Sequence, residues 1–462
     1  MSKLLSKPEP ATAAPRRVPL WRSSVHSLGT SIIAIGLAVA INILIARALG
    51  PQGKGSYELV LATTALLCIM LGFSLPVGVT YVVARGRANL RALVRQLAGV
   101  VTLFGLLAAV ILYVLRQTSL SPSFIPPEME KEIVILMALT AGAMEASNYW
   151  RAILNGRQEI IRANRGDLLS RAAHAVILLV AVALLAHMRQ PATPTLFITL
   201  NLAVLVLTNI IFLKILRSAL QPSPGPSGLA EVITYAFPCF LGNFIQFLNY
   251  RLDVFLVNYF SGRDAVGLYT LAVSLGQMIW LISRAAATVL LPNVAALQEA
   301  ADNNAQRTAQ ITRVAFGLSL ASALALAIVA TPLVPLVFGS AFRPSVTPLL
   351  WLLPGIVVFS AANVLASYFA GIGKPRLNLY VAWAGLVVTI VFDLLLIPAF
   401  GIAGAAIAST LSYSTSTVAI VWLFVRQSRL PVRQVLVLTR EDLALGISLL
   451  RSLFQRQRLE GR

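Results

Sequence analysis

Apolar runs of about twenty residues recur along almost the whole chain, and the polar connections between them are short. A helix of this length crosses a hydrocarbon core of about 30 Å. Hydrophobic residues make up 58% of the 462 residues and charged residues only 12%, a composition that excludes a soluble globular protein. No connection is long enough for a separate soluble catalytic domain. The chain is therefore predicted to be an all-α integral membrane protein.

About twelve transmembrane helices are predicted from these runs. They are expected at 25–46, 57–83, 93–115, 132–154, 166–187, 194–215, 232–259, 266–291, 312–337, 347–370, 377–398 and 402–425. The first run is too long for a signal-peptide core, so it is taken as a retained span. Lysines and arginines are concentrated in the connections on the N-terminal side of the membrane. The positive-inside rule therefore predicts that both termini are cytoplasmic, and the protein is expected in the cell (inner) membrane.

Two features divide the chain into halves of six helices. Residues 217–230 are rich in proline and glycine and predict an extended linker. A short repeat also matches at constant spacing: Gly50, Gly55, Tyr57 and Leu59 correspond to Gly262, Gly267, Tyr269 and Leu271. Because each half has an even number of spans, the two copies point the same way, which predicts a parallel pseudo-twofold repeat.

The predicted organisation has five parts. These are a basic cytoplasmic tail (1–24), an N-lobe of six helices (25–216), the linker (217–230), a C-lobe of six helices (231–426) and a basic amphipathic tail (427–462). The last part is expected either as a helix on the anionic inner leaflet or as a partly disordered tail.

Several function classes are excluded by what the chain lacks. The net charge of +20 comes from residues at membrane boundaries and forms no folded basic face, so no nucleic-acid partner is expected. The three histidines and two cysteines have no metal-ligand spacing, and neither a P-loop nor a nucleophile elbow occurs. We therefore expect a transporter, with no catalytic residues, no metal site and no cofactor.

Ionised side chains inside the seventh and eighth predicted spans indicate a polar cavity. Arg251, Asp253 and Arg284 each cost roughly 2.5–3.5 kcal/mol at a membrane helix centre, so water, a partner or a ligand should meet them. One helix face is predicted from Thr270, Ser274, Gln277, Arg284 and Thr288. A broad arc on the preceding helix holds Asn243, Gln246, Asn249, Tyr250, Asp253 and Asn258.

The roles of these charges stay open at this level. The two arginines either bind an anionic ligand or serve as structural ion pairs or interfacial anchors, and Asp253 is an arginine partner, an ion-coupling group or a cap. Glu145 with Asn148, and Asp167 with Arg171, cluster near the cytoplasmic ends of spans four and five. Asp167 and Arg171 form an i,i+4 pair that either ties down its helix or, with Glu145, contributes to the inward mouth of the cavity.

Five stretches in order resemble the polysaccharide and lipid-linked oligosaccharide flippases of the multidrug/oligosaccharidyl-lipid/polysaccharide exporter superfamily. They are ARALGPQGKGSYELVLA (46–62), RLDVFLVNYFSGRDAVGLYTLA (251–272), VFGSAFRPSVTPLLWLLPGIVVF (337–359), YFAGIGKPRLNL (368–379) and IPAFGIAGAAIASTLSY (397–413). The resemblance implies two six-helix lobes around a central cavity, alternating access and a cationic lumen, which Arg251 and Arg284 would match. The candidate substrate-binding residues are Arg284, Arg251, Asp253, Gln277, Ser274, Gln246, Asn243, Arg171 and Glu145.

The function implied is transport of a polyprenyl-(di)phosphate-linked oligosaccharide from the cytoplasmic to the outer leaflet, for lipopolysaccharide or exopolysaccharide assembly. An Na⁺ or H⁺ gradient or the membrane potential is the expected driver. Membrane lipids, a glycan polymerase and export machinery are the expected partners. The alternatives are a multidrug exporter of the same superfamily, and a membrane glycosyl transferase or polymerase on the same carrier. The glycan, the coupling ion and the oligomeric state stay open.

Overall fold

The computed structural model describes residues 20–439, apart from 87, 128, 130, 131, 218, 219, 221–225 and 297–300. Side chains are described from residue 33, with further gaps at 288, 289, 291–296 and 301–303. The predicted tail up to residue 19, half of the predicted linker (218, 219 and 221–225) and the tail beyond 439 thus lie outside the described residues, as does the Thr288 side chain.

The regular elements of the described residues are all helical. The first half holds α1 (Leu20–Gly72), α2 (Leu75–Ala84), α3 (Leu90–Arg116), α4 (Ser121–Phe124), α5 (Ile133–Gly156), α6 (Ile160–Met188) and α7 (Pro194–Leu216). The second half holds α8 (Leu229–Gln277), α9 (Trp280–Ala296), α10 (Ala301–Phe338), η2 (Ser340–Ser345), α11 (Val346–Gly371), α12 (Pro375–Ser428) and α13 (Val432–Leu436).

Three of the long helices are each two spans joined at a glycine. Gly50 in α1, Gly262 in α8 and Gly401 in α12 have φ of 65°, 80° and 55°, a left-handed region that glycine adopts without steric cost. Eight described helices are long and apolar enough to cross a membrane. When α1, α8 and α12 are counted twice and α5 is added, the predicted twelve-helix arrangement is confirmed.

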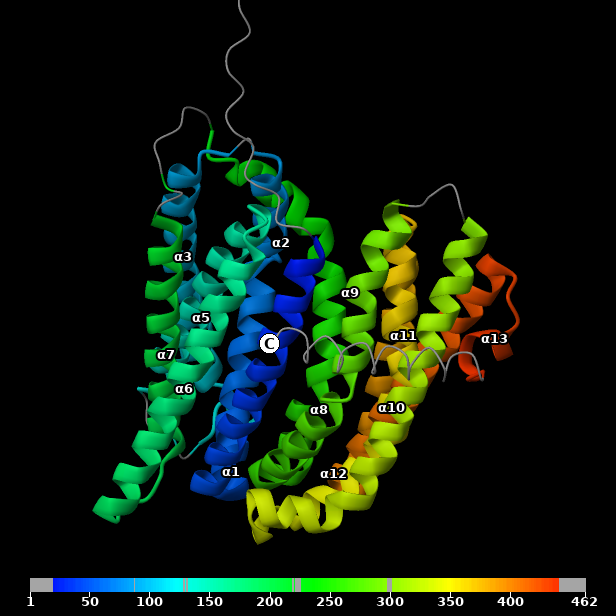
Figure 1. The fold of residues 1–462 in the computed structure, drawn as a ribbon. Coiled ribbons are helices and arrows are strands. Elements are labelled where there is room, and N and C mark those ends of the chain that lie inside the picture. Colours follow the sequence, from blue (N-terminus) through cyan, green and yellow to red (C-terminus); the bar gives the residue numbers. More distant parts are fainter. Residues whose placement is uncertain are drawn as a thin grey trace, which may run out of the picture.

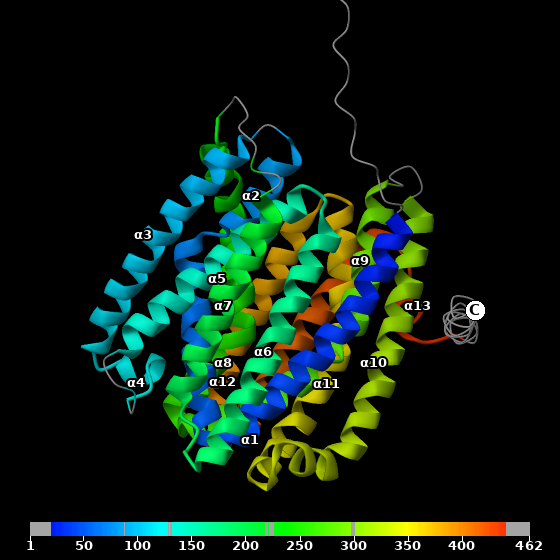
Figure 2. The ribbon, with the colours of Figure 1, turned by 60° about the vertical axis from the view of Figure 1, so that its left-hand side comes forward.

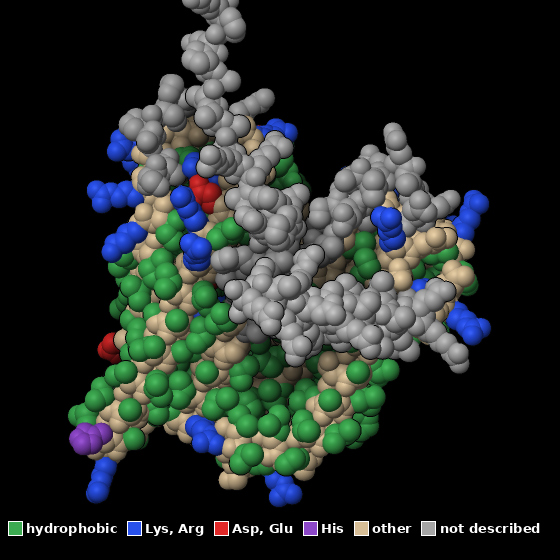
Figure 3. Space-filling model, viewed as in Figure 1, with side chains coloured by type: hydrophobic (Ala, Val, Ile, Leu, Met, Phe, Trp, Pro, Cys, Tyr) green, Lys and Arg blue, Asp and Glu red, His purple; other side chains and the backbone are tan. Residues whose placement is uncertain are grey.

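The helices form two groups, α1–α7 and α8–α12, which stand side by side (Figures 1 and 2). The α1 and α8 turns lie at the lower end of Figure 1, which we call the glycine-turn end. The other end holds the connections after α2, α5, α7 and α11 and is called the basic end. Hydrophobic side chains cover most of the described surface between the two ends, where few Lys or Arg are seen (Figure 3).

The predicted repeat is confirmed by a reciprocal contact where α1 and α8 meet. A methyl group on Gly55 would overlap the carbonyl oxygen of Arg263, and one on Gly267 would overlap that of Pro51. Pro51 and Arg263 are themselves equivalent positions, so the two contacts are copies related by a pseudo-twofold axis. Since both glycine turns lie at the same end, this axis runs along the helices.

Two predicted spans are interrupted. The span 57–83 breaks at Phe73 and Ser74, which have φ of 43° and 56°, and the span 266–291 breaks between Gln277 and Trp280. The second break separates Arg284 from the polar stripe predicted on a single helix face. The hydroxyls of Thr270 and Ser274 also bond back to carbonyls one turn earlier, at 2.8 and 2.7 Å. These hydroxyls thus satisfy their own helix, and the predicted stripe does not run along one uninterrupted helix.

The two groups of helices touch at both ends. At the glycine-turn end, the Arg47 guanidinium donates to the last carbonyls of α10, Leu336 O at 2.6 Å and Val337 O at 2.7 Å. Asn258 Nδ2 donates to Pro122 O at 2.8 Å. Toward the basic end, the first half of α8 lies against α2, where the rings of Tyr81 and Tyr235 stack with centroids 3.7 Å apart.

Candidate transport cavities

A central cavity of about 570 Å³ lies between the two groups of helices. Its lining comes from α1, α2, α5 and α8 and from Ser74, where α1 and α2 break. The polar lining residues are Ser74, Thr80, Glu145, Asn148, Arg151, Asn155, Asn243 and Gln246. Asn243 Nδ2 donates to Ser74 Oγ at 2.9 Å and joins the two halves across the cavity. The break in the second predicted span therefore contributes directly to this site.

Glu145 is a buried carboxylate of the central cavity, only 2% exposed. Its Oε2 accepts from Asn148 Nδ2 at 3.3 Å, and the Tyr149 hydroxyl on the same helix lies close enough to interact with the carboxylate. Gly72 lies beside Oε1 and has no side chain to fill the space there, since a methyl carbon on this residue would lie 2.7 Å from the oxygen. Glu145 therefore keeps acceptor capacity for a ligand hydroxyl, a proton or a cation.

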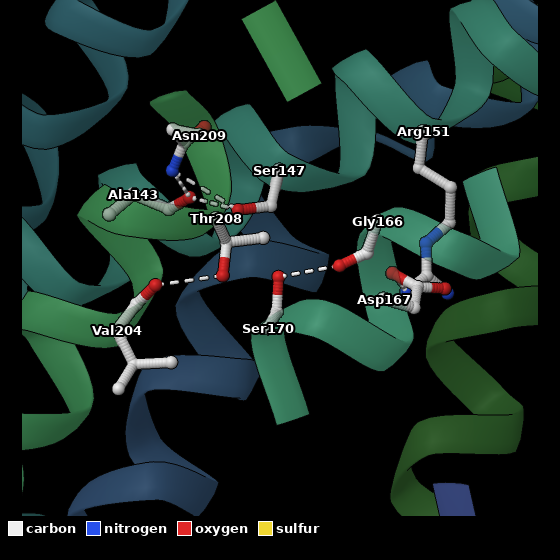
Figure 4. A network of polar contacts seen from close by, with 9 residues as sticks. All are labelled: Ala143, Ser147, Arg151, Gly166, Asp167, Ser170, Val204, Thr208 and Asn209. Carbon is white, nitrogen blue, oxygen red and sulfur yellow. Dashed lines mark hydrogen bonds and ion pairs between the residues drawn. The ribbon is translucent and has the colours of Figure 1, made fainter. Parts of the chain in front are cut away.

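Arg151 is the basic residue of the same lining, and its guanidinium is bonded to Asp167 on α6 (Figure 4). The same close-up shows how α5, α6 and α7 are held together behind it. Asn209 on α7 donates to Ala143 O at 2.9 Å and to Ser147 Oγ at 3.1 Å. Asp167 was predicted to pair with Arg171 one helical turn away. Arg171 is exposed, and the partner within ion-pair distance comes from the neighbouring helix instead.

A second, smaller cavity of about 100 Å³ lies among α8, α11 and α12, and we call it the C-lobe chamber. Gln246 lines both cavities, so the chamber meets the central cavity at this residue. The described lining of the chamber contains no Asp, Glu, Lys, Arg or His. It consists of Gln246, Asn249, Tyr250, Phe359, Ala362, Asn363, Ala366, Asn378, Val381, Ala382, Ser412, Tyr413, Ser416 and Ile420.

Four aromatic rings pack together at the wall of the chamber. Trp280 has ring centroids 5.6 Å from Tyr250, 5.2 Å from Phe359 and 5.4 Å from Tyr413. Its Nε1 donates to Ile356 O at 3.0 Å, which fixes the indole. Arg284 is exposed, and its guanidinium carbon lies 5.9 Å from the centre of the Trp280 ring, within cation–π range. Arg284 thus stands beside the chamber wall and forms no ion pair among the described residues.

Two buried carboxylates lie deeper in the second half. Asp253 is 4% exposed and accepts from Tyr269 Oη, which also lies 3.2 Å from Ser409 Oγ. Asp393 is fully buried, neither of its oxygens has a hydrogen-bond partner among the described residues, and it lies close enough to Asp253 for the two charges to interact. In the sequence, Asp393 lies close to Pro398 near the end of the predicted span 377–398, a position typical of the membrane interface. Packing of α12 against α8 buries it instead.

Arg251 is half-buried near charges of both halves, since its charge acts on Asp253 and on Glu58 of α1. Glu58 accepts from Lys54 at 2.7 Å, and Lys54 is only 1% exposed although it was predicted to lie in an outer loop. The helix resumes at Pro51, so the loop does not exist. The i,i+4 spacing of Lys54 and Glu58 was the signal that could have shown this pair.

The nine predicted site residues are thus distributed unevenly. Asn243, Gln246 and Glu145 line the central cavity, and Arg284 stands beside the C-lobe chamber. Arg251 and Asp253 lie deeper in the second half, where Asp253 is close to Asp393 and to Tyr269. Ser274, Gln277 and Arg171 line neither cavity. The predictions missed Arg151, Asn155, Asn363 and Asn378 as lining residues, because these lie on helices whose facing partners cannot be read from one span.

Comparison with known proteins shows which protein families the chain matches. A family profile described as lipid II flippase MurJ matches residues 169–454, and one described as polysaccharide biosynthesis protein matches residues 20–298. An uncharacterized membrane protein of Methanocaldococcus jannaschii is 27% identical over 43% of this chain and 37% of its own length. A probable low-salt glycan biosynthesis flippase, Agl15 of Haloferax volcanii, is 24% identical over 36% of each. The matches thus span little more than a third of either relative.

Solved structures show the same fold. A lipid II flippase MurJ in an inward closed conformation has a TM-score of 0.70 at 12% identity, over 88% of this chain and 90% of that chain. An inward-facing multidrug resistance MATE family transporter of the MOP superfamily has a TM-score of 0.67 at 17% identity, over 88% of this chain and 98% of that chain. At these identities the similarity concerns the fold alone.

Proposed function

The chain belongs to a flippase family of the multidrug/oligosaccharidyl-lipid/polysaccharide exporter superfamily, and we propose that it moves a polyprenyl-(di)phosphate-linked oligosaccharide across the membrane. The proposed direction is from the cytoplasmic to the outer leaflet, by alternating access. The observation that carries the proposal is the central cavity of about 570 Å³ between the two halves, lined by amides, hydroxyls and charged groups.

The physical need for such a cavity follows from the substrate. Sugar hydroxyls and phosphates lose their water on entering hydrocarbon, at several kcal/mol per unpaired polar group. Asn148, Asn155, Asn243 and Gln246 supply replacement contacts for hydroxyls, and the polyprenyl tail stays in lipid. Arg284 is proposed to hold the phosphate end, because its guanidinium is charged, exposed and positioned by Trp280.

The conformation supports the proposed direction of loading. The Arg47 contact to α10, the Asn258 contact to Pro122 and the Gly55–Gly267 approach close the glycine-turn end. The cavity lining instead extends to Arg151 and Asn155, near the end of α5 at the basic end. If the basic end faces the cytoplasm, as the charge distribution predicts, this state accepts substrate from the inside.

Coupling is proposed to use the Asp253–Asp393 pair. Two buried carboxylates close to each other repel when both are ionised, so a proton or a metal cation stabilises the pair. The hydroxyls of Tyr269 and Ser409 lie beside it and can complete the coordination of either ion. Binding and release of this ion would bias the two access states through α8, which lines the central cavity at Gln246 and Phe247, about two turns from Asp253.

A flipping assay with purified protein tests the function. The protein is reconstituted into vesicles that contain an undecaprenyl-diphosphate-linked sugar, and impermeant periodate oxidises the outer-leaflet copies. We expect protein-containing vesicles to expose the inner-leaflet copies in a second round of oxidation, and protein-free vesicles to expose none. Transport of an organic cation such as ethidium without any flipping would contradict the proposal and indicate a multidrug exporter.

A further inference from the structure

The C-lobe chamber contains two amide oxygens held in place without a partner. Asn249 Nδ2 donates to Ala382 O and Asn378 Nδ2 donates to Ala366 O, each at 2.9 Å. These bonds fix both amide groups. The Oδ1 atoms of both residues are buried, and neither accepts a hydrogen bond from a described residue.

Two fixed amide oxygens that accept no hydrogen bond from a described residue belong to the lining of one cavity. They indicate a ligand that carries hydrogen-bond donors. A buried carbonyl oxygen left without a partner costs about 1–3 kcal/mol, so a site that keeps two of them is matched to donors that arrive from elsewhere. Hydroxyl groups and acetamido N–H groups are such donors. Phosphates and carboxylates are not, because they carry acceptors only, and no Lys, Arg or His lines the chamber to receive them.

The rest of the lining fits one face of a sugar ring. Tyr250, Phe359 and Tyr413 contribute aromatic surface, on which the C–H face of a pyranose can pack, and Ser416 with Gln246 adds further polar atoms. At roughly 10–15 Å³ for each water, the volume of about 100 Å³ suits a single ring and is too small for an oligosaccharide. Gln246 lies between the chamber and the central cavity, and Arg284 stands beside the aromatic wall.

We propose that the C-lobe chamber is a subsite for one neutral sugar ring of the transported lipid, bound by donation to Asn249 Oδ1 and Asn378 Oδ1. The proposal rests on the proposed flippase function and adds a specificity for the charge of one sugar in the transported lipid. A neutral sugar is accepted, whereas a uronic acid in this position is not. With a phosphate at Arg284, the ring nearest the carrier is the one that reaches the chamber.

The test compares carriers that differ by one sugar. Binding to the purified protein is measured by microscale thermophoresis for undecaprenyl diphosphate and for the same carrier bearing glucose, galactose, N-acetylglucosamine or glucuronic acid. We expect at least one neutral sugar to strengthen binding by about tenfold over the bare carrier, the effect of one or two buried hydrogen bonds. Glucuronic acid should add nothing.

Two variants locate the gain in the chamber. Asn249→Ala combined with Asn378→Ala should bring the sugar-bearing carrier to within about twofold of the bare carrier, while bare-carrier affinity is unchanged. Ala366→Leu, which fills the chamber and keeps both amides, should do the same. Asn201→Ala on α7, away from both cavities, is the matched control and should keep the gain.

Each outcome is decisive. If all neutral sugars bind wild-type protein no better than the bare carrier, or if the gain survives both chamber variants, the subsite is contradicted while the flippase function stands. If no carrier binds at all, the flippase function itself is contradicted.

Discussion

Single charged residues inside the helices carry most of the proposed mechanism, and Arg284 is the first to test. Arg284→Ala should leave protein level and insertion intact, since it removes an insertion penalty and strands no described partner charge. Glycan export per molecule of folded protein should fall by more than about tenfold in a complementation assay. Arg284→Lys should restore it only in part, because lysine lacks the bidentate fork. Arg343→Ala, in η2 at the glycine-turn end, is the control. Unchanged specific activity of Arg284→Ala would remove this residue from the site.

Asp393 is the second residue-scale test. Asp393→Asn keeps the shape of a fully buried side chain and removes its charge, so folded protein should be retained or increase. Flipping driven by an imposed Na⁺ or H⁺ gradient should lose its dependence on that gradient. Asp264→Asn, at an exposed position next to the glycine turn, should keep the dependence. A fully coupled Asp393→Asn variant would show that the carboxylate pair is not the coupling site.

At the scale of helices, the closest packing is the reciprocal contact of α1 and α8. Gly55→Ala and Gly267→Ala should each lower stability by about 1–3 kcal/mol or more, because the added methyl overlaps a backbone carbonyl that cannot rotate away. This cost exceeds the gain of up to about 1 kcal/mol that alanine brings to a helix. At Gly99 on α3 an added methyl carbon would have no described neighbour within 4 Å, so Gly99→Ala should be neutral or stabilising. Equal melting temperatures for all three variants, measured in detergent, would argue against the close approach.

The contact between Arg47 and the end of α10 joins the two halves at the glycine-turn end. Arg47→Ala leaves the carbonyls of Leu336 and Val337 without this donor and should favour the state that is open at that end. A cysteine introduced at Thr80 in the central cavity, in a variant lacking Cys68 and Cys239, should then react more slowly with a thiol reagent from the basic side. An unchanged rate would show that Arg47 does not hold the closed end.

For the whole molecule, the two ends of the bundle must face opposite sides of the membrane. In the same cysteine-free variant, cysteines at Ser119, Ser261 and Ser340 should react with an impermeant reagent in intact cells, while cysteines at Ala230 and Arg376 should react only after lysis. All five positions are described as exposed. Labelling of Ala230→Cys or Arg376→Cys in intact cells would reverse the orientation and with it the proposed direction of transport.

The amino-acid sequence by itself determined the all-α membrane architecture, the twelve spans and the parallel repeat. Span length, hydropathy and the glycine turns are local properties, and the free energy of burying apolar helices in lipid follows from them directly. Gly50 and Gly262 were recognised because they match at constant spacing, each at the turn between the first two spans of its half. Asn243, Gln246 and Glu145 could be proposed as cavity residues because a polar group in an apolar membrane helix is costly unless water, a partner residue or a ligand contacts it.

Only the tertiary structure decided which of these groups meet. The break at Phe73 and Ser74 brings Ser74 to Asn243, Asp167 binds Arg151 rather than Arg171, and Asp393 is buried beside Asp253 instead of reaching the interface. The C-lobe chamber combines residues of α8, α11 and α12, far apart in the chain. Such pairings depend on the rotation and spacing of neighbouring helices, which are set by packing of side chains from many elements at once. Helical periodicity within one span contains no information about them.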